Sequence, residues 1–82
     1  MTATSDLMSQ LEADAEYFQP RAFAIYGVSR GKPFIGWGLD AEGDRGAVYW
    51  DPRTNATHIS TSAEHILQTQ QRIGDAHLKW LD

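Results

Sequence analysis

Residues 23–50, FAIYGVSRGKPFIGWGLDAEGDRGAVYW, hold six of the nine Phe, Tyr and Trp residues of the chain and most of its glycines. Short runs of β-branched and aromatic residues that are separated by glycine and polar residues are typical of antiparallel strands joined by tight turns. The stretch therefore predicts a twisted antiparallel sheet. The rest of the chain is expected to pack around it.

The register of the first hairpin decides which of its side chains are buried. The two strands are predicted at 22–28 and 32–39, and a three-residue loop at 29–31 pairs Val28 with Lys32. This register gathers the large apolar residues on one face, whereas a two-residue turn divides them between both faces. The three-residue loop is therefore preferred. The core face that it predicts carries Phe23, Ile25, Ile35, Trp37 and Leu39.

The opposite face of this hairpin is the predicted partner-binding surface. In the preferred register Tyr26 stands opposite Phe34, and two glycines of the second strand stand opposite alanines, so the face is shallow and half aromatic. Two interpretations are open, since either a helix of the same chain covers these rings or a partner binds them. The predicted binding residues are Tyr26, Phe34, Gly36 and Gly38, with Arg30 and Lys32 at the rim.

Residues 1–20 form an N-terminal segment with a predicted amphipathic helix at 5–18, which ends before Pro20 because the residue that precedes a proline avoids the helical region. The helix either packs on the sheet or stays loosely attached and binds a partner. Spacings of four, four and three residues place one apolar stripe along it. The stripe consists of Leu7, Leu11, Ala15 and Phe18, and Met8 widens it.

The second half of the chain predicts two further strands, a helix and a last strand. Thr61 and Glu64 have the spacing of a capping box, and Gly74 is the predicted left-handed end of the helix. The whole is one α+β domain, 1–82, in which one or two helices pack on an antiparallel sheet of four to five strands. The predicted elements are strands at 47–50 and 56–60, a helix at 61–73 that buries Ala63, Ile66, Leu67 and Ile73, and a strand at 76–81.

Composition narrows the classes of function. The chain has no cysteine, so a disulfide framework, a thiolate metal site and a catalytic thiol are excluded. The net charge of -4 and the pI near 5.1 disfavour a mainly electrostatic grip on nucleic acid. The acidic N-terminal segment has no apolar run of signal-peptide or membrane-spanning length, which predicts a cytoplasmic protein.

No cluster of polar residues has the spacing of a metal-binding or catalytic site. The acidic loop at 40–46 has alternating carboxylates but lacks the sharp glycine turn of a calcium loop. His58, His65 and His77 are seven and twelve residues apart and form no local two-ligand pair for zinc. No catalytic residue, metal ligand or cofactor is therefore predicted.

The sequence favours a small non-enzymatic protein-interaction module, a regulator, inhibitor or accessory subunit, that binds through its sheet face or forms a homodimer. The alternative is a weak binder of single-stranded nucleic acid that uses Tyr26 and Phe34 with Arg30 and Lys32. A third hypothesis is a metal-binding or minor enzymatic role. Segments 36–39 and 78–82 resemble parts of small bacterial proteins, and no function is inferred from that likeness.

Overall fold

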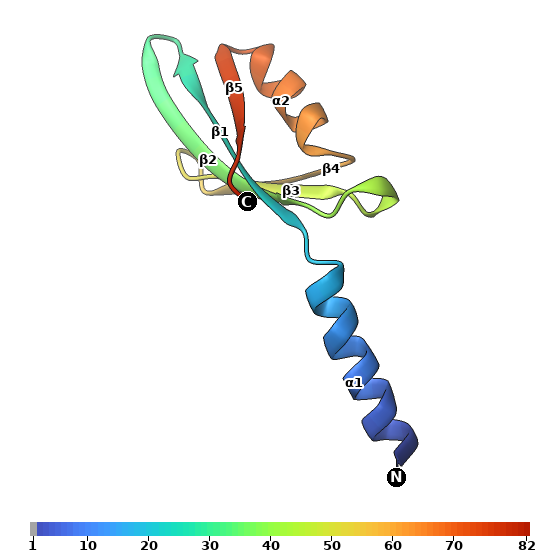
Figure 1. Ribbon diagram of the computed structural model, residues 1–82. Coiled ribbons are helices and arrows are strands. Elements are labelled where there is room, and N and C mark those ends of the chain that lie inside the picture. The colour runs from blue at the N-terminus through green and yellow to red at the C-terminus, as the bar shows by residue number, and fades with distance from the viewer. Residues whose placement is uncertain (1) are drawn as a thin grey trace.

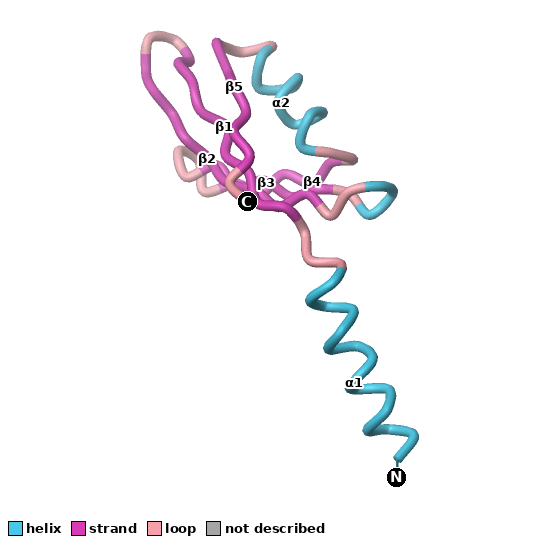
Figure 2. Tube along the Cα trace, viewed as in Figure 1, coloured by secondary structure: helices cyan, strands magenta, loops and turns pink. Residues whose placement is uncertain are grey.

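The computed structural model describes residues 2–82 as a five-stranded sheet, a helix packed on one face of the sheet, and a second helix that extends away from it (Figures 1 and 2). In chain order the elements are α1 (Thr2–Tyr17), β1 (Arg21–Ser29), β2 (Lys32–Asp40), the 3-10 turn η1 (Gly43–Arg45), β3 (Ala47–Asp51), β4 (Ala56–Ser60), α2 (Ala63–Gln71) and β5 (Asp75–Trp80). This is an α+β fold with a single antiparallel sheet, as the sequence predicts.

The sheet has the order β4-β3-β2-β1-β5, and all neighbouring strands are antiparallel. The first four strands form a meander, because each pairs with the next along the chain. Helix α2 then carries the chain across one face of the sheet, from β4 at one edge to β5 at the other (Figure 1). One face is thereby covered by a helix.

The predicted register of the first hairpin is wrong. Ser29 pairs with Lys32, so the connection is a two-residue turn of Arg30 and Gly31. Their φ angles of 54° and 78° are both positive, as in the type I′ turn, whose twist matches that of the two strands. The shift of one residue moves every side chain of β2 to the opposite face relative to β1.

Two aromatic rings fill the core above the glycines of β2. Phe23 on β1 and Tyr49 on β3 are fully buried and stack with their ring centroids 6.4 Å apart. Strand β2 lies between β1 and β3, and the two rings lie over it. Cβ atoms added at Gly36 or Gly38 would overlap these rings. Burial raises the pKa of Tyr49 to about 12, so its phenol is neutral at physiological pH. The glycines of β2 thus make room for the core.

The predicted core is confirmed in part. Phe23 and Ile25 are fully buried, whereas Ile35, Trp37 and Leu39 lie on the face opposite α2 and are about half exposed, which corrects the prediction. The cause is the register, since Phe23 pairs with Gly38 instead of facing Trp37. The observed core consists of Phe23, Ile25, Phe34, Ala47, Tyr49, Ala63, Ile66 and Ala76.

The start of α2 is held by two side chains. Ser62 is the N-cap, and its hydroxyl accepts a hydrogen bond of 3.1 Å from the amide of His65, in place of the predicted pair of Thr61 and Glu64. The buried carboxylate of Asp40 accepts the amide of Ala63 at 2.9 Å. Asp40 therefore ties the end of β2 to the first turn of α2.

The end of α2 also differs from the prediction. The helix ends at Gln71, two residues early, and Ile73 is exposed while Gln70 is buried. Gly74 does not have the left-handed conformation expected of it. It lies instead against β1, where a Cβ atom would come within 2.7 Å of the Val28 carbonyl oxygen. Close approach of two backbones explains this glycine.

Helix α1 projects away from the sheet (Figure 1). The molecule is therefore elongated, with a length of 60 Å along its longest axis and about 20 Å along the other two. The apolar side chains of Leu7, Met8, Leu11 and Phe18 are at least half exposed. Within residues 2–82, no helix is long and apolar enough to cross a membrane.

Candidate functional site

The face of the sheet opposite α2, here called the open face, is apolar and exposed. Its side chains share one side because cross-strand neighbours such as Tyr26 and Ile35, or Leu39 and Val48, point the same way. Each of the eight large apolar residues on it is between 40% and 83% exposed. The open face consists of Tyr26, Val28, Ile35, Trp37, Leu39, Val48, Trp50 and Ile59.

Two tryptophans form the centre of the open face. Trp37 on β2 and Trp50 on β3 are directly paired, and their rings stack with centroids 6.3 Å apart. The indole nitrogen of Trp50 donates a hydrogen bond of 3.0 Å to the amide oxygen of Asn55, which fixes the ring. A shallow groove of about 390 Å³ runs beside the two tryptophans. Its lining is mainly apolar, because Leu39, Val48 and Leu81 also contribute to it. The groove can hold an apolar side chain of a partner.

The size of the open face sets it apart from ordinary exposed apolar residues. If each fully exposed side chain presents about 150–250 Å², the eight together leave on the order of 700 Å² of apolar surface in water. The largest patch of a typical monomer is about 300–600 Å² and often functional. A standard protein interface covers about 800 Å² on each partner. The open face therefore has the area of an interface.

The predicted binding residues are divided between the two faces. Tyr26 lies on the open face and is 43% exposed, whereas Phe34 is buried on the side of α2. Gly36 and Gly38 lie under the core rings of Tyr49 and Phe23. The prediction that these residues form one surface is wrong, because the hairpin register places Tyr26 opposite Ile35.

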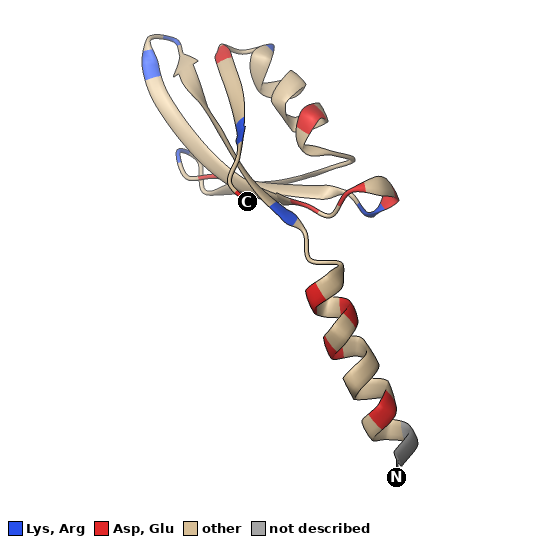
Figure 3. Ribbon diagram, in the orientation of Figure 1, with Lys and Arg blue, Asp and Glu red and all other residues tan. Residues whose placement is uncertain are grey.

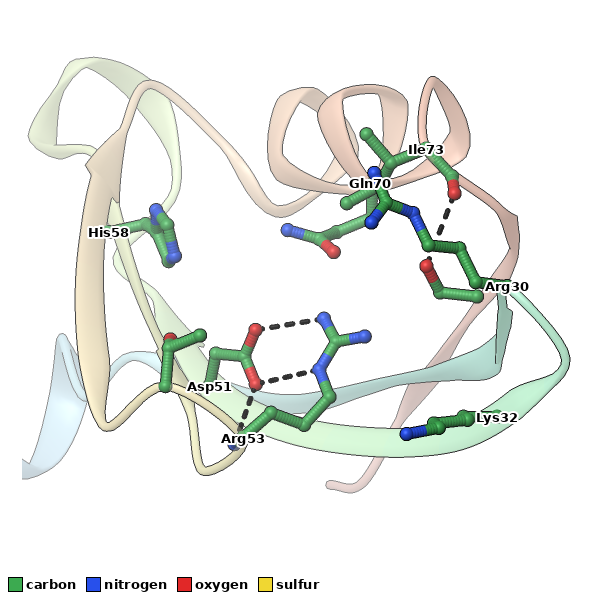
Figure 4. A pocket seen from close by; sticks show the side chains of 9 residues that line it. Arg30, Lys32, Asp51, Arg53, His58, Gln70 and Ile73 are labelled. Atoms are coloured by element: carbon green, nitrogen blue, oxygen red, sulfur yellow. Dashed lines mark hydrogen bonds and ion pairs between the residues drawn. The ribbon is translucent and has the colours of Figure 1, made fainter.

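Arg30 and Lys32 lie near a cavity on the side of α2 instead of at the rim of the open face. The cavity has a volume of about 480 Å³ and is bounded by the hairpin, β3 and the last turn of α2. Figure 4 shows Asp51 and Arg53 on one wall and Gln70 on the other. The amide oxygen of Gln70 has no hydrogen-bond partner among the described residues.

An ion pair closes one wall of this cavity. The guanidinium of Arg53 donates two hydrogen bonds, of 3.1 and 2.8 Å, to the carboxylate of Asp51, and the Asp51 side chain is only 6% exposed. The same guanidinium lies 4.1 Å above the ring of Phe34. Hydrogen bonding to Arg53 holds the pKa of the Asp51 carboxyl below its usual range, although burial opposes this shift.

The ion pair of Asp51 and Arg53 predicts that the folded state loses stability in acid. A carboxyl with a lower pKa in the folded than in the unfolded state contributes stability above its unfolded pKa of about 3.9, and loses it as the pH falls through the folded value. We expect Asp51→Asn to lower the urea midpoint at pH 7, and the difference from the wild type to shrink as the pH falls through the lowered pKa of the folded state. Equal differences at pH 7 and below that pKa would contradict the assignment. Asp82→Asn is the control, because its pair with Arg21 is solvent-exposed and therefore screened.

The histidines and carboxylates do not gather into a site. His58 lies near Tyr49 on the side of α2, His65 contacts the Ser60 hydroxyl through its Nδ1 atom, and His77 lies beside Tyr26 on the other face. Among residues 2–82, no three His, Asp or Glu side chains are placed to hold a metal ion. All four acidic residues of the N-terminal segment 1–20 lie in α1, which carries no basic residue (Figure 3).

Searches of protein-family models, curated proteins and solved structures find no match to the chain.

Sequence reasoning missed most of the open face, since it assigned Ile35, Trp37 and Leu39 to the core. A signal for the correct side exists in Gly36 and Gly38, because glycines at alternate positions leave a groove on one face of a strand. Large rings from the two neighbouring strands fill that groove, which identifies the glycine side as the buried one.

Proposed function

We propose that the protein is a non-enzymatic interaction module that docks a protein partner on the open face of its sheet. The observation that supports the proposal is the set of eight exposed apolar side chains on a face that no element of the described chain covers. Docking removes this surface from water, which is the dominant favourable term in most protein associations.

The centre of the open face has the composition of an energetic hot spot. Tryptophan and tyrosine are enriched where interfaces contribute most of their binding energy, and Trp37, Trp50 and Tyr26 all lie on this face. The stacked tryptophans are already held in place, Trp50 by its bond to Asn55, so little side-chain entropy is lost on binding. Asp75, His77 and Lys79 on the edge strand β5 provide a polar rim.

Site-specific photo-cross-linking tests the proposal. A benzophenone amino acid replaces Trp37 in the full chain, which is expressed in cells and irradiated. We expect a defined covalent product with a protein, because the probe lies at the centre of the docking surface. Mass spectrometry of the product identifies the cross-linked peptide.

The matched control carries the same probe at Thr54, on the turn at the other side of the sheet near the helix-side cavity. It should give no such product. A probe at position 37 that yields only uncross-linked protein, or that reacts only with the α1 of its own chain, would overturn the proposal, since the face would then need no partner.

The nucleic-acid alternative has one structural feature in its favour, namely three aromatic rings on one face of a sheet. However, Trp37 and Trp50 stack on each other, and Tyr26 stands opposite Ile35 instead of beside them. Lys79 is the basic residue that the β1–β5 register places on that side. Electrostatic contacts to phosphate are therefore sparse. A nucleic-acid adduct in the same cross-linking experiment would favour this alternative over protein docking.

A further inference from the structure

The chain contains a second apolar surface without a partner, on helix α1. Residues spaced by three and four fall on one side of a helix, so Leu7, Leu11, Ala15 and Phe18 form a continuous stripe that Met8 widens. Leu7, Met8, Leu11 and Phe18 are 50–60% exposed. Two exposed apolar surfaces of one chain therefore need to be covered.

Helix α1 does not have the properties of a helix that is stable alone in water. Isolated helices shorter than about 12–15 residues are marginal in water, and most helices in proteins take their stability from the packing of an apolar face. The 16 residues of α1 have no acidic residue in the first turn and no basic residue in the last, so interaction with the helix dipole adds little. A surface that receives the stripe would supply the missing stability.

We propose that α1 of each copy lies on the open face of a second copy, so that two chains exchange their N-terminal helices in a twofold dimer. The proposal rests on the open face being a docking surface, and names its occupant. A twofold arrangement is closed, because the helix and the sheet face of each copy are both used and no further copy can be added.

The dimensions of the two surfaces agree. A helix of 16 residues is about 24 Å long at 1.5 Å per residue. Five strands spaced by about 4.8 Å form a sheet of similar width, roughly 20–25 Å. One α1 can therefore cross the whole open face. The groove beside Trp37 and Trp50 can accommodate one large side chain of the stripe.

The charges also agree. Helix α1 carries Asp6, Glu12, Asp14 and Glu16 and no basic residue, as Figure 3 shows. The positions of Glu12 and Asp14 border the apolar stripe on its two sides. On the receiving face, the large residues are uncharged, and the charged residues lie at the β5 edge, where Lys79 is accompanied by Asp75, whose carboxylate lies 3.1 Å from the Nε2 atom of His77. An acidic helix therefore meets no carboxylate at the centre of the face.

The connection to β1 directs α1 toward another molecule. Only residues 18–20 link the helix to the strand. The amide of Phe18 donates to the Asp14 carbonyl at 2.8 Å, and the Arg45 guanidinium lies 5.4 Å from the centroid of the Phe18 ring. The hydrogen bond continues the helical turn to Phe18, and the Arg45 contact joins the end of α1 to the rest of the chain. From there α1 points away from its own sheet (Figure 1). A second copy is thus favoured over folding back within one chain.

Cysteine trapping tests the exchange, and the chain contains no cysteine that could interfere. A chain with Leu11→Cys and one tag is mixed with a chain that has Leu39→Cys or Val48→Cys and another tag, and the mixture is unfolded, refolded and oxidised. We expect a disulfide-linked pair that contains both tags. Ala13→Cys, which lies on the other side of α1, replaces Leu11→Cys in the control and should give much less of this pair.

A matched pair of charge substitutions tests the same contact in solution. Ala15→Glu places a carboxylate on the stripe, whereas Ala13→Glu makes the same change on the opposite side of the helix. By sedimentation analysis we expect the wild type and Ala13→Glu to have twice the 9.2 kDa mass of the chain. Ala15→Glu should weaken the dimer by at least about tenfold, because burying an unpaired charge is unfavourable.

The outcomes separate this proposal from the proposed function. A monomer at all concentrations, or a Leu11→Cys/Val48→Cys double variant that forms its disulfide only within one chain, would overturn the helix exchange. If the chain is monomeric while a probe at Trp37 still cross-links to a different protein, the docking function stands and the identity of its occupant is wrong. If both tests fail, the open face is not a docking surface.

Discussion

Gly36→Ala is expected to lower the free energy of unfolding by about 3 kcal/mol, the upper end of the usual cost of overpacking a core. The added methyl group would overlap the phenol of Tyr49, which is fully buried and stacked on Phe23. Both rings belong to the buried core, so displacing either disturbs its packing. An 82-residue domain has a total stability of about 4–12 kcal/mol, so the loss is a large part of it.

Chemical denaturation of the wild type and the variant measures this loss, and Gly43→Ala is the matched control. Gly43 has no neighbour within 4 Å of an added Cβ atom, but its φ of 61° is unfavourable for alanine. The control should therefore lose only about 1–2 kcal/mol from backbone strain. Gly36 has no positive φ. A loss of less than 1 kcal/mol at Gly36 would mean that the ring of Tyr49 does not lie over β2.

Asp40→Ala is expected to destabilise the fold by a similar amount, about 3 kcal/mol, because it removes two hydrogen bonds to a buried side chain. The Asp40 carboxylate is 4% exposed and accepts the amides of Glu42 and Ala63, at 2.6 and 2.9 Å. The second of these amides is in the first turn of α2. Loss of the Asp40 carboxylate leaves the amide of Ala63 buried without a hydrogen-bond acceptor.

Amide hydrogen exchange gives a local measure of the Asp40 contact. The amide of Ala63 should exchange faster in Asp40→Ala than in the wild type, relative to amides of β1. Asp44→Ala makes the same change on an exposed residue of η1 and should alter neither quantity. If Asp40→Ala and Asp44→Ala are equally stable, Asp40 does not hold the helix to the sheet.

Periodicity alone was sufficient for the elements but not for their faces. Both helices and all five strands are close to the predicted positions, because patterns of two and 3.6 residues identify them and Pro20 separates α1 from β1. The hairpin register failed for a local reason. A type I′ turn usually has Asn or Asp at its first position, and here Arg30 adopts the positive φ.

Alternation alone could not predict the candidate site, because β1 and β2 are apolar on both faces. Alternation identifies a buried face only when the other face is polar. In β2, Phe34 faces the core while Ile35, Trp37 and Leu39 face outward, so the pattern alone fits either side. What distinguishes the faces is the pair of rings that lie over Gly36 and Gly38, and one of them, Tyr49, comes from a strand more than ten residues along the chain. An apolar pattern on both faces nevertheless indicated that both need a cover.

The stacked pair of Trp37 and Trp50 gives the protein a built-in optical reporter. The chain has three tryptophans, and the third, Trp80, lies on the side of α2 with the Arg21 guanidinium 4.0 Å above its ring. With centroids 6.3 Å apart, the two indoles of the open face are close enough for their electronic transitions to couple. Their near-ultraviolet circular dichroism and fluorescence emission therefore follow the covering and uncovering of that surface, without any attached label.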